Sequence, residues 1–253
     1  TGAQIIHRFT ETKPLSTYLI AFAAGPWTVQ TRAEAIREGE SPVPVSLYVR
    51  ASRATEAESD TLVATNARAL RWLGTYFGTP YGFDKYASLL APAFPFGGME
   101  HPGAVFYNED SFIYRERPTT TQLLGRQATI YHEVAHQWFG DLVTMRWFDD
   151  LWLKEGFATF MAARMQSEVD PQSNAWKTFY LRNKPVAYAT DATLGTTPVW
   201  QALGNLDQAK SNYGPIVYNK APSVLRQLEY LVGPAAFQRG VQAFLRTHRY
   251  GNA

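Results

Sequence analysis

Residues 132–160 read HEVAHQWFGDLVTMRWFDDLWLKEGFATF, and this stretch decides how the chain folds. The apolar spacing predicts one helix over residues 122–140 and a second over residues 150–167. From Gly140 at the end of the first helix to Phe148, the chain is long enough to turn back. We therefore expect the second helix to pack beside the first, so that one face of each helix contacts the other.

The first helix carries two histidines at a spacing that suits a metal ion. His132 and His136 lie one turn apart and about 40° apart around the axis, so both imidazoles can reach one ion while Glu133 projects beside them. Glu155 follows after 18 intervening residues and brings a carboxylate from the second helix. Two nitrogens and one carboxylate predict zinc, with a fourth position left for water. HExxH alone also arises by chance, so the prediction depends on Glu155.

Composition narrows the class of protein. The 253 residues are 45% hydrophobic, enough for a substantial core, and 24 Lys and Arg against 22 Asp and Glu give a net charge of +2, which does not indicate a nucleic-acid partner. No run approaches the roughly 18 apolar residues of a membrane span. The absence of cysteine excludes disulfides, thiolate metal sites and a cysteine nucleophile. A soluble protein, cytoplasmic or exported, is expected, and its start at Thr1 indicates an excerpt or a processed product.

The order of the predicted elements indicates the fold class. Short strand-like runs precede residue 122, and the pattern is largely helical after it. Strands first and helices afterwards predict an α+β fold, with a small mixed sheet followed by a helical lobe. The expected strands are 16–23, 27–31, 43–49, 86–91 and 105–114, and the further expected helices are 56–77, 171–184, 217–232 and 234–248.

Three motifs together resemble a known family. The block at 132–160 resembles the signature of the HExxH-x18-E zinc aminopeptidases, the M1 family of gluzincins that contains aminopeptidase N and the leukotriene hydrolase. FGGMEHPG at 96–103 is similar to the family's GxMEN loop, and YNKA at 218–221 matches its Y-x-K-G/A motif. The resemblance implies a thermolysin-like catalytic domain over residues 26–253. It also implies that residues 1–25 are the last strands of an N-terminal β domain, and that flanking domains lie outside this chain.

The resemblance also implies an activity and a role for each motif residue. The activity is hydrolysis of the first peptide bond of peptides with a free N-terminus, which releases single amino acids. Glu133 would be the general base, Tyr218 would hydrogen-bond the developing oxyanion, and Glu100 would pair with the α-ammonium of the substrate. One zinc per chain would be held by His132, His136 and Glu155, while Phe96, Gly97, Gly98 and Met99 would bind the substrate.

Three positions depart from the family pattern. His101, Asp141 and Lys154 stand where the family usually has Asn. None of them removes a ligand, the base or the oxyanion donor. Lys154 is one residue from Glu155, about 100° around the helix, so its side chain is expected to point away from the metal. Candidate partners for the outer nitrogens of the histidines are Asp149, Asp150 and Thr159.

Two alternatives remain open at this point. The family resemblance permits an epoxide hydrolase of the leukotriene type, which needs a long lipid pocket. It also permits a non-catalytic relative that serves as an interaction scaffold, although such a protein would be expected to have lost a ligand or the base. Metal content and an aminoacyl reporter substrate distinguish these readings from an aminopeptidase.

Overall fold

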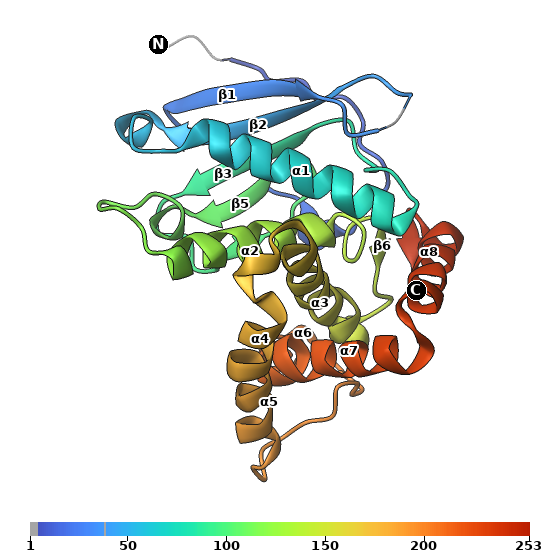
Figure 1. The fold of residues 1–253 in the computed structure, drawn as a ribbon. Helices are drawn as coiled ribbons and strands as arrows, with labels where there is room; N and C mark the ends of the chain where they lie inside the picture. The colour runs from blue at the N-terminus through green and yellow to red at the C-terminus, as the bar shows by residue number, and fades with distance from the viewer. Residues whose placement is uncertain (1–4, 38) are drawn as a thin grey trace.

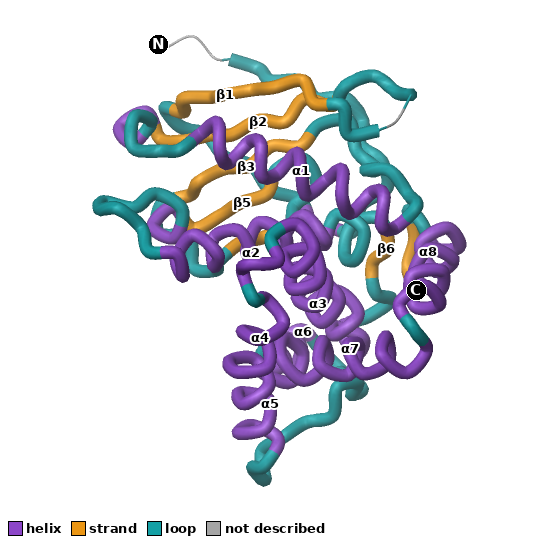
Figure 2. The backbone as a smooth tube through the Cα atoms, viewed as in Figure 1, coloured by secondary structure: helices purple, strands orange, loops and turns teal. Residues whose placement is uncertain are grey.

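The computed structural model describes residues 5–37 and 39–253, which form a sheet lobe and a helical lobe (Figure 1). Figure 2 shows the longer strands gathered in one lobe and most of the helices in the other. The expected α+β class is therefore confirmed. The strands of the main sheet are β1 (Trp27–Glu34), β2 (Val43–Arg50), β3 (Tyr86–Ala91), β4 (Gly98–Met99) and β5 (Val105–Asn108).

The main sheet is mixed and runs in the order β1-β2-β3-β5-β4. The β2–β3 and β3–β5 pairs are parallel, whereas the outer pairs β1–β2 and β4–β5 are antiparallel. Every residue of the central strand β3 is buried, as expected for a parallel strand covered on both faces. The short strand β4 is an edge strand, and it belongs to the glycine-rich loop that contains Glu100.

Most of the helices follow the main sheet in the chain, whereas the helix Ser59–Phe77 lies between β2 and β3. Among the described residues, no helix combines the length and the apolar content that crossing a bilayer requires. Two short strands, β6 (Val143–Thr144) and β7 (Gly251–Asn252), pair separately from the main sheet. The helices are α1 (Ser59–Phe77), α2 (Thr120–His136), α3 (Leu151–Val169), α4 (Ala175–Thr178), α5 (Lys184–Asp191), α6 (Leu206–Asn212), α7 (Ala221–Val232) and α8 (Pro234–His248).

One continuous apolar core joins the sheet to α1, α2, α3 and α8. Trp138 is fully buried just after α2, and its indole N–H donates to the carbonyl of Thr79 at 2.8 Å. The rings of Phe139 and Phe157 stack at 4.2 Å, which fixes the end of α2 against α3. This packing holds the two metal-site helices side by side without any contribution from the site itself.

The structure differs from the sequence prediction at several element boundaries. The run 16–23, expected as a strand, holds a short 3-10 helix at Thr17–Leu19 and no strand. The strand expected to continue to residue 114 ends at Asn108, whose side chain accepts a hydrogen bond from the Asp110 N–H and starts a 3-10 turn. The helix expected over 171–184 is interrupted, because Asn174 takes a left-handed conformation with φ 52° before α4 begins.

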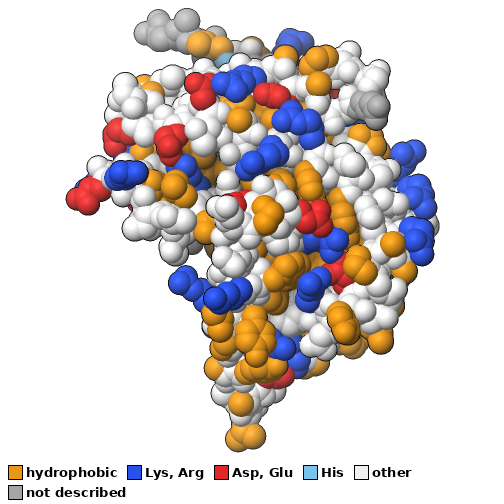
Figure 3. Space-filling view, viewed as in Figure 1, with side chains coloured by type: hydrophobic (Ala, Val, Ile, Leu, Met, Phe, Trp, Pro, Cys, Tyr) orange, Lys and Arg blue, Asp and Glu red, His pale blue; other side chains and the backbone are white. Residues whose placement is uncertain are grey.

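Most of the exposed large apolar side chains among the described residues lie in three stretches. These are residues 5–22, the surroundings of α5, and α7. Figure 3 shows apolar side chains gathered on the narrow lower part of the molecule, which α4, α5 and the following loop form. The exposed residues around α5 are Tyr180, Leu181, Val186, Tyr188 and Leu194.

Candidate active site

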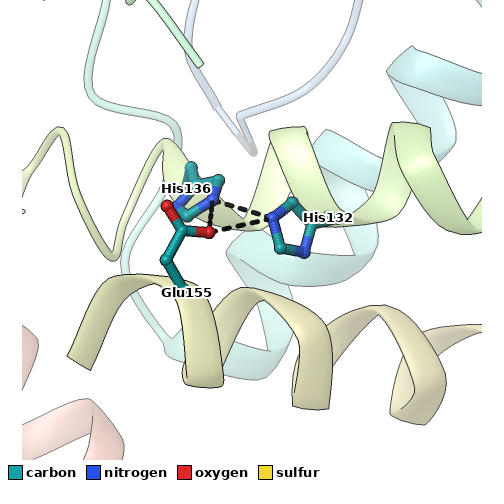
Figure 4. Close-up of side chains that lie close together, drawn as sticks. All are labelled: His132, His136 and Glu155. Carbon is teal, nitrogen blue, oxygen red and sulfur yellow. Dashed lines mark hydrogen bonds and ion pairs between the residues drawn. The ribbon is translucent and has the colours of Figure 1, made fainter. Parts of the chain in front are cut away.

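The histidine pair is presented by the last two turns of α2. A capping box between Thr119 and Gln122 fixes where this helix begins. The four-residue spacing then places His132 and His136 on one face, and their Nε2 atoms lie 3.0 Å apart (Figure 4). The sequence-based expectation of two converging imidazoles thus matches the geometry.

Glu155 reaches the pair from α3. Its Oε2 atom lies 3.3 Å from the Nε2 atom of His132 and 3.3 Å from that of His136. The three side chains form a group that could hold a metal ion, and their ligand atoms all lie within 4.8 Å of one another. Gly140 makes the return possible, because its φ of +133° is a conformation that residues with a side chain rarely adopt.

Each histidine is oriented by a partner on its outer nitrogen. The Nδ1 atom of His136 lies 2.9 Å from the carbonyl of Phe139, and Nδ1 of His132 lies 3.3 Å from the hydroxyl of Thr159. A carbonyl can only accept, so the His136 proton sits on Nδ1 when the ring is neutral, and the Nε2 lone pair faces the site. Thr159 therefore matches its expected position, whereas Asp149 accepts from the Leu203 N–H and Asp150 from the Trp152 indole.

These contacts fit a cation better than they fit the bare side chains. With both rings neutral and the His132 proton on Nδ1, two nitrogen lone pairs would face each other and a carboxylate oxygen. Burial alone would lower the pKa of His136, but the carboxylates of Glu100 and Glu155 outweigh it and raise the pKa to about 9. Burial lowers the pKa of His132. The nearby carboxylates thus favour a positive charge at this position.

Glu133 lies beside this group and is almost completely enclosed. It is 5% exposed, and burial raises its pKa to about 8. Gly98 of β4 makes room for it: a Cβ atom at Gly98 would lie 2.5 Å from the Glu133 Oε1 atom. Gly98 was expected to bind the substrate, and the structure shows that the Glu133 side chain lies where a Cβ atom would otherwise be.

Glu100 is 3% exposed and is held by Lys154. The Lys154 Nζ atom lies 2.5 Å from Glu100 Oε1 and 2.9 Å from Glu155 Oε1. The expectation that Lys154 points away from the metal group is therefore wrong. The 100° step around α3 directs this long side chain toward Glu100. The Lys154 ammonium then lies within reach of the carboxylates of both Glu100 and Glu155.

The other two departures from the family pattern also lie near Glu100. His101 is the next residue, and burial lowers its pKa. Asp141 is 3% exposed and neither of its carboxylate oxygens has a hydrogen-bond partner among the described residues. Burial raises the pKa of Asp141 well above its ordinary value, and the charge of Glu100 adds to the effect. A protonated Asp141 would resemble the usual Asn in carrying no charge.

Tyr218 stands across the cavity on the turn that precedes α7. Residues Ile216–Lys220 form a π-helical turn, and the Tyr218 ring centre lies 6.2 Å from that of His132. Burial raises the pKa of its phenol, and the Glu155 carboxylate raises it further, so the group stays a neutral hydrogen-bond donor. The turn is held to α3 by close backbone packing, since a Cβ at Gly156 would lie 2.8 Å from the Ala221 Cβ.

All of the site residues predicted from the sequence line one cavity of about 1040 Å³. Lys154, Tyr213 and the edge strand β4 also line the cavity. Phe96 lies at the rim, 61% exposed. A volume of this order suits a ligand of several residues.

Tyr18 lies against Lys154 of the site, although no motif indicated this contact. Its hydroxyl lies 3.5 Å from the carbonyl of Gly140, and its ring centre lies 5.1 Å from the Lys154 Nζ atom. The segment around Tyr18 has an ordinary apolar composition. Tyr18 and Gly140 are 122 positions apart in the sequence, and only the tertiary fold brings them together. Its contact with Lys154 was therefore outside what local sequence could indicate.

Comparison with known proteins agrees with this fold and geometry. The model of the peptidase family M1 domain matches residues 62–253. The chain is 38% identical over 250 residues to aminopeptidase N of Streptomyces lividans, 32% identical over 253 residues to leucyl aminopeptidase of Saccharolobus solfataricus, and 32% identical over 246 residues to aminopeptidase M1-A of Oryza sativa subsp. japonica. These matches cover 98%, 100% and 97% of this chain and 29%, 31% and 27% of the relatives. The chain thus spans about 30% of the length of the curated relatives it matches.

A cavity with three side chains that could hold a metal ion, on two facing helices, fits a metallopeptidase, and the matched family is one. This chain belongs to peptidase family M1.

Proposed function

We propose that this chain carries the catalytic site of a zinc aminopeptidase, which removes single residues from the free N-terminus of peptides. The observation that carries the proposal is the convergence of His132, His136 and Glu155 in a cavity that also holds Glu133 and Glu100. The aminopeptidase names of the relatives support it and favour neither of the two alternatives.

Zinc is the ion that the donor set suits best. Two imidazole nitrogens and one carboxylate oxygen are a common set in catalytic zinc sites, and the chain has no cysteine to offer a thiolate. When bound, zinc would polarise a carbonyl oxygen and lower the pKa of a water molecule toward 7. His132, His136 and Glu155 would hold it, and the partners of the outer nitrogens would keep the rings in place.

Glu133 is the proposed general base. It lies in the cavity next to the metal group, where its carboxylate could take a proton from the attacking water and pass it to the leaving amine. Its raised pKa in the metal-free protein arises from burial, and a divalent cation nearby would lower it again. The residue is thus suited to exchange a proton near neutral pH.

Glu100 and β4 are the proposed binding elements for the peptide. Glu100 is a buried carboxylate in the same cavity, and it would pair with the α-ammonium by a charge-assisted hydrogen bond. The edge strand β4, with Gly97 and Met99, would run beside the main chain of the substrate. Fixing the first residue at Glu100 would place the first peptide bond at the metal group.

Tyr218 is the proposed oxyanion donor. Its phenol is neutral and lines the cavity on the side of His132, where it could donate to the oxygen on which charge develops. Residues 26–253 are the proposed catalytic domain, and residues 1–25 the proposed end of a preceding β domain. Residues 1–4 lie outside the described part of the chain.

A panel of aminoacyl arylamides, assayed with and without a chelator, tests this function. We expect hydrolysis that the chelator abolishes and added zinc restores, together with one bound zinc per chain by elemental analysis. N-acetylated substrates should be poor, and Glu133→Gln should keep zinc while turnover falls about 10² to 10⁴ fold. Equal cleavage of free and acetylated peptides would contradict the aminopeptidase assignment, and an active preparation without metal would contradict the zinc site.

A further inference from the structure

The ammonium of Lys154 lies in surroundings that suit any primary ammonium ion. Lys154 is 2% exposed, and its Nζ atom lies 2.5 Å from Glu100 Oε1 and 2.9 Å from Glu155 Oε1. The ring centres of Tyr18 and Tyr213 lie 5.1 and 5.8 Å from the same nitrogen. Carboxylates and aromatic faces are the groups that bind ammonium ions in proteins, and two of each surround this nitrogen.

The carboxylate closest to Lys154 is the one proposed to bind the substrate. Glu100 is the proposed partner of the α-ammonium of the peptide, and its Oε1 atom already accepts a hydrogen bond from the Lys154 Nζ atom. A substrate ammonium that reaches Glu100 therefore either displaces Lys154 or lies beside a second positive charge. Both arrangements weaken binding, because the first breaks a charge-assisted hydrogen bond and the second brings like charges together in a buried site.

The same contact acts on the product of the proposed reaction. Hydrolysis of the first peptide bond releases a free amino acid, which carries an α-ammonium as the substrate does. A site that bound this group too tightly would retain the product and delay the next cycle. The Lys154 side chain is tethered within bonding distance of Glu100, so it can return to the carboxylate when the product ammonium leaves.

We propose that Lys154 is a resident competitor for the ammonium site at Glu100, which weakens the binding of amine ligands and speeds release of the amino-acid product. The inference rests on the proposed role of Glu100, and it concerns the affinity of that site for amines. The family usually has the uncharged Asn at this position, so the competition would distinguish this chain from relatives with Asn.

Equilibrium binding of two small ligands tests the proposal without reliance on activity. Isoamylammonium and isoamyl alcohol share an apolar chain and differ in carrying an ammonium or a hydroxyl group. Calorimetry on the zinc-loaded protein gives the dissociation constant of each ligand. Lys154→Met should bind the ammonium about tenfold more tightly than the parent does, on the scale of one charge-assisted hydrogen bond, while the alcohol should bind equally to both.

Two further variants complete the comparison. Lys210 also lines the cavity, but its side chain is 78% exposed and pairs with Asp207. Lys210→Met removes the same charge from an exposed position, so both dissociation constants should stay within about twofold of the parent. Lys154→Asn places the usual family residue in the site and should tighten ammonium binding as Lys154→Met does. It provides the measurement if Lys154→Met does not fold.

Inhibition by the product gives a second readout. In Lys154→Met, the KM of an aminoacyl arylamide and the inhibition constant of the corresponding free amino acid should both decrease, each by about tenfold. Lys210→Met should change neither constant by more than about twofold. A parallel decrease of the two constants is the expected sign of tighter ammonium binding, because substrate and product share that group.

The outcomes separate this inference from the proposed function. Equal ammonium affinities in the parent and the Lys154 variants would refute the competition, and weaker binding in the variants would show that Lys154 holds Glu100 in place for the substrate. An equal gain in Lys210→Met would assign the effect to net charge, and this too would overturn the proposal. If Glu100→Ala binds the ammonium as tightly as the parent does, the proposed amine-binding role of Glu100 itself is wrong.

Discussion

Gly98→Ala is the sharpest test of how the site is built. A Cβ atom there would lie 2.5 Å from Glu133 Oε1 and 2.6 Å from its Cδ and Cγ atoms. Ordinary contacts between such atoms are about 3.5 Å, so the carboxylate must move by about 1 Å. Gly98 pairs with Tyr107 in the sheet, and we therefore expect the Glu133 side chain to give way before the backbone does.

A displacement of about 1 Å in a catalytic group costs on the order of 10² in rate. We therefore expect kcat/KM of Gly98→Ala to fall about a hundredfold, with folding and zinc content unchanged. Gly125→Ala on α2 is the matched control, because this glycine also lines the cavity but nothing lies within 4 Å of a Cβ built there. That variant should stay within about twofold of the parent.

The assay measures kcat/KM on an aminoacyl arylamide for both glycine variants, together with bound zinc and thermal unfolding. Parent-like activity of Gly98→Ala would refute the role of Glu133 or its position against β4. Equal losses in the two variants would show that the effect does not arise from the contact with Glu133.

Three further predictions concern Glu133, Tyr218 and Gly156. In the metal-free protein the Glu133 pKa is raised from the ordinary 4.5 to about 8. The unfolded chain therefore releases this proton at lower pH than the folded chain. The free energy of unfolding decreases as the pH rises from 4.5 to about 8. Glu133→Gln has no carboxyl to ionise and so does not lose this stability. The free energy of unfolding of the variant should therefore rise relative to that of the parent between pH 4.5 and pH 8, by at most about 5 kcal/mol, in urea titrations with a chelator. A gain that does not change with pH would contradict the buried, protonated carboxyl. Tyr218→Phe should keep zinc and fold while kcat falls roughly 10² to 10³ fold, and an unchanged kcat would reduce Tyr218 to a packing role. Gly156→Ala should destabilise the protein by about 1 to 3 kcal/mol in the same titrations, since its Cβ would lie 2.8 Å from that of Ala221, and an unchanged midpoint would show that α3 and α7 can separate at no cost.

Much of the fold was predictable because its patterns are local. The β3 strand at 86–91 and the α8 helix at 234–248 match their predicted bounds, since a short apolar run between polar turns and a 3.6-residue stripe each describe a buried face directly. The break at Asn174 was missed because a left-handed residue carries only a weak sequence signal. The run 16–23 was misread as a strand because its apolar residues suggested a buried face, whereas Leu19 is buried and Ile20 and Phe22 are exposed.

The sequence by itself determined which residues could form the metal group. Fixed helical spacing brings His132 and His136 together, and the 18-residue interval allows Glu155 to return to them. The tertiary structure alone decided the direction of Lys154, the contact of Tyr18 and the reason for Gly98. Spacing along a helix fixes directions within about two turns, whereas the partner of a long buried side chain depends on which distant segment folds against it.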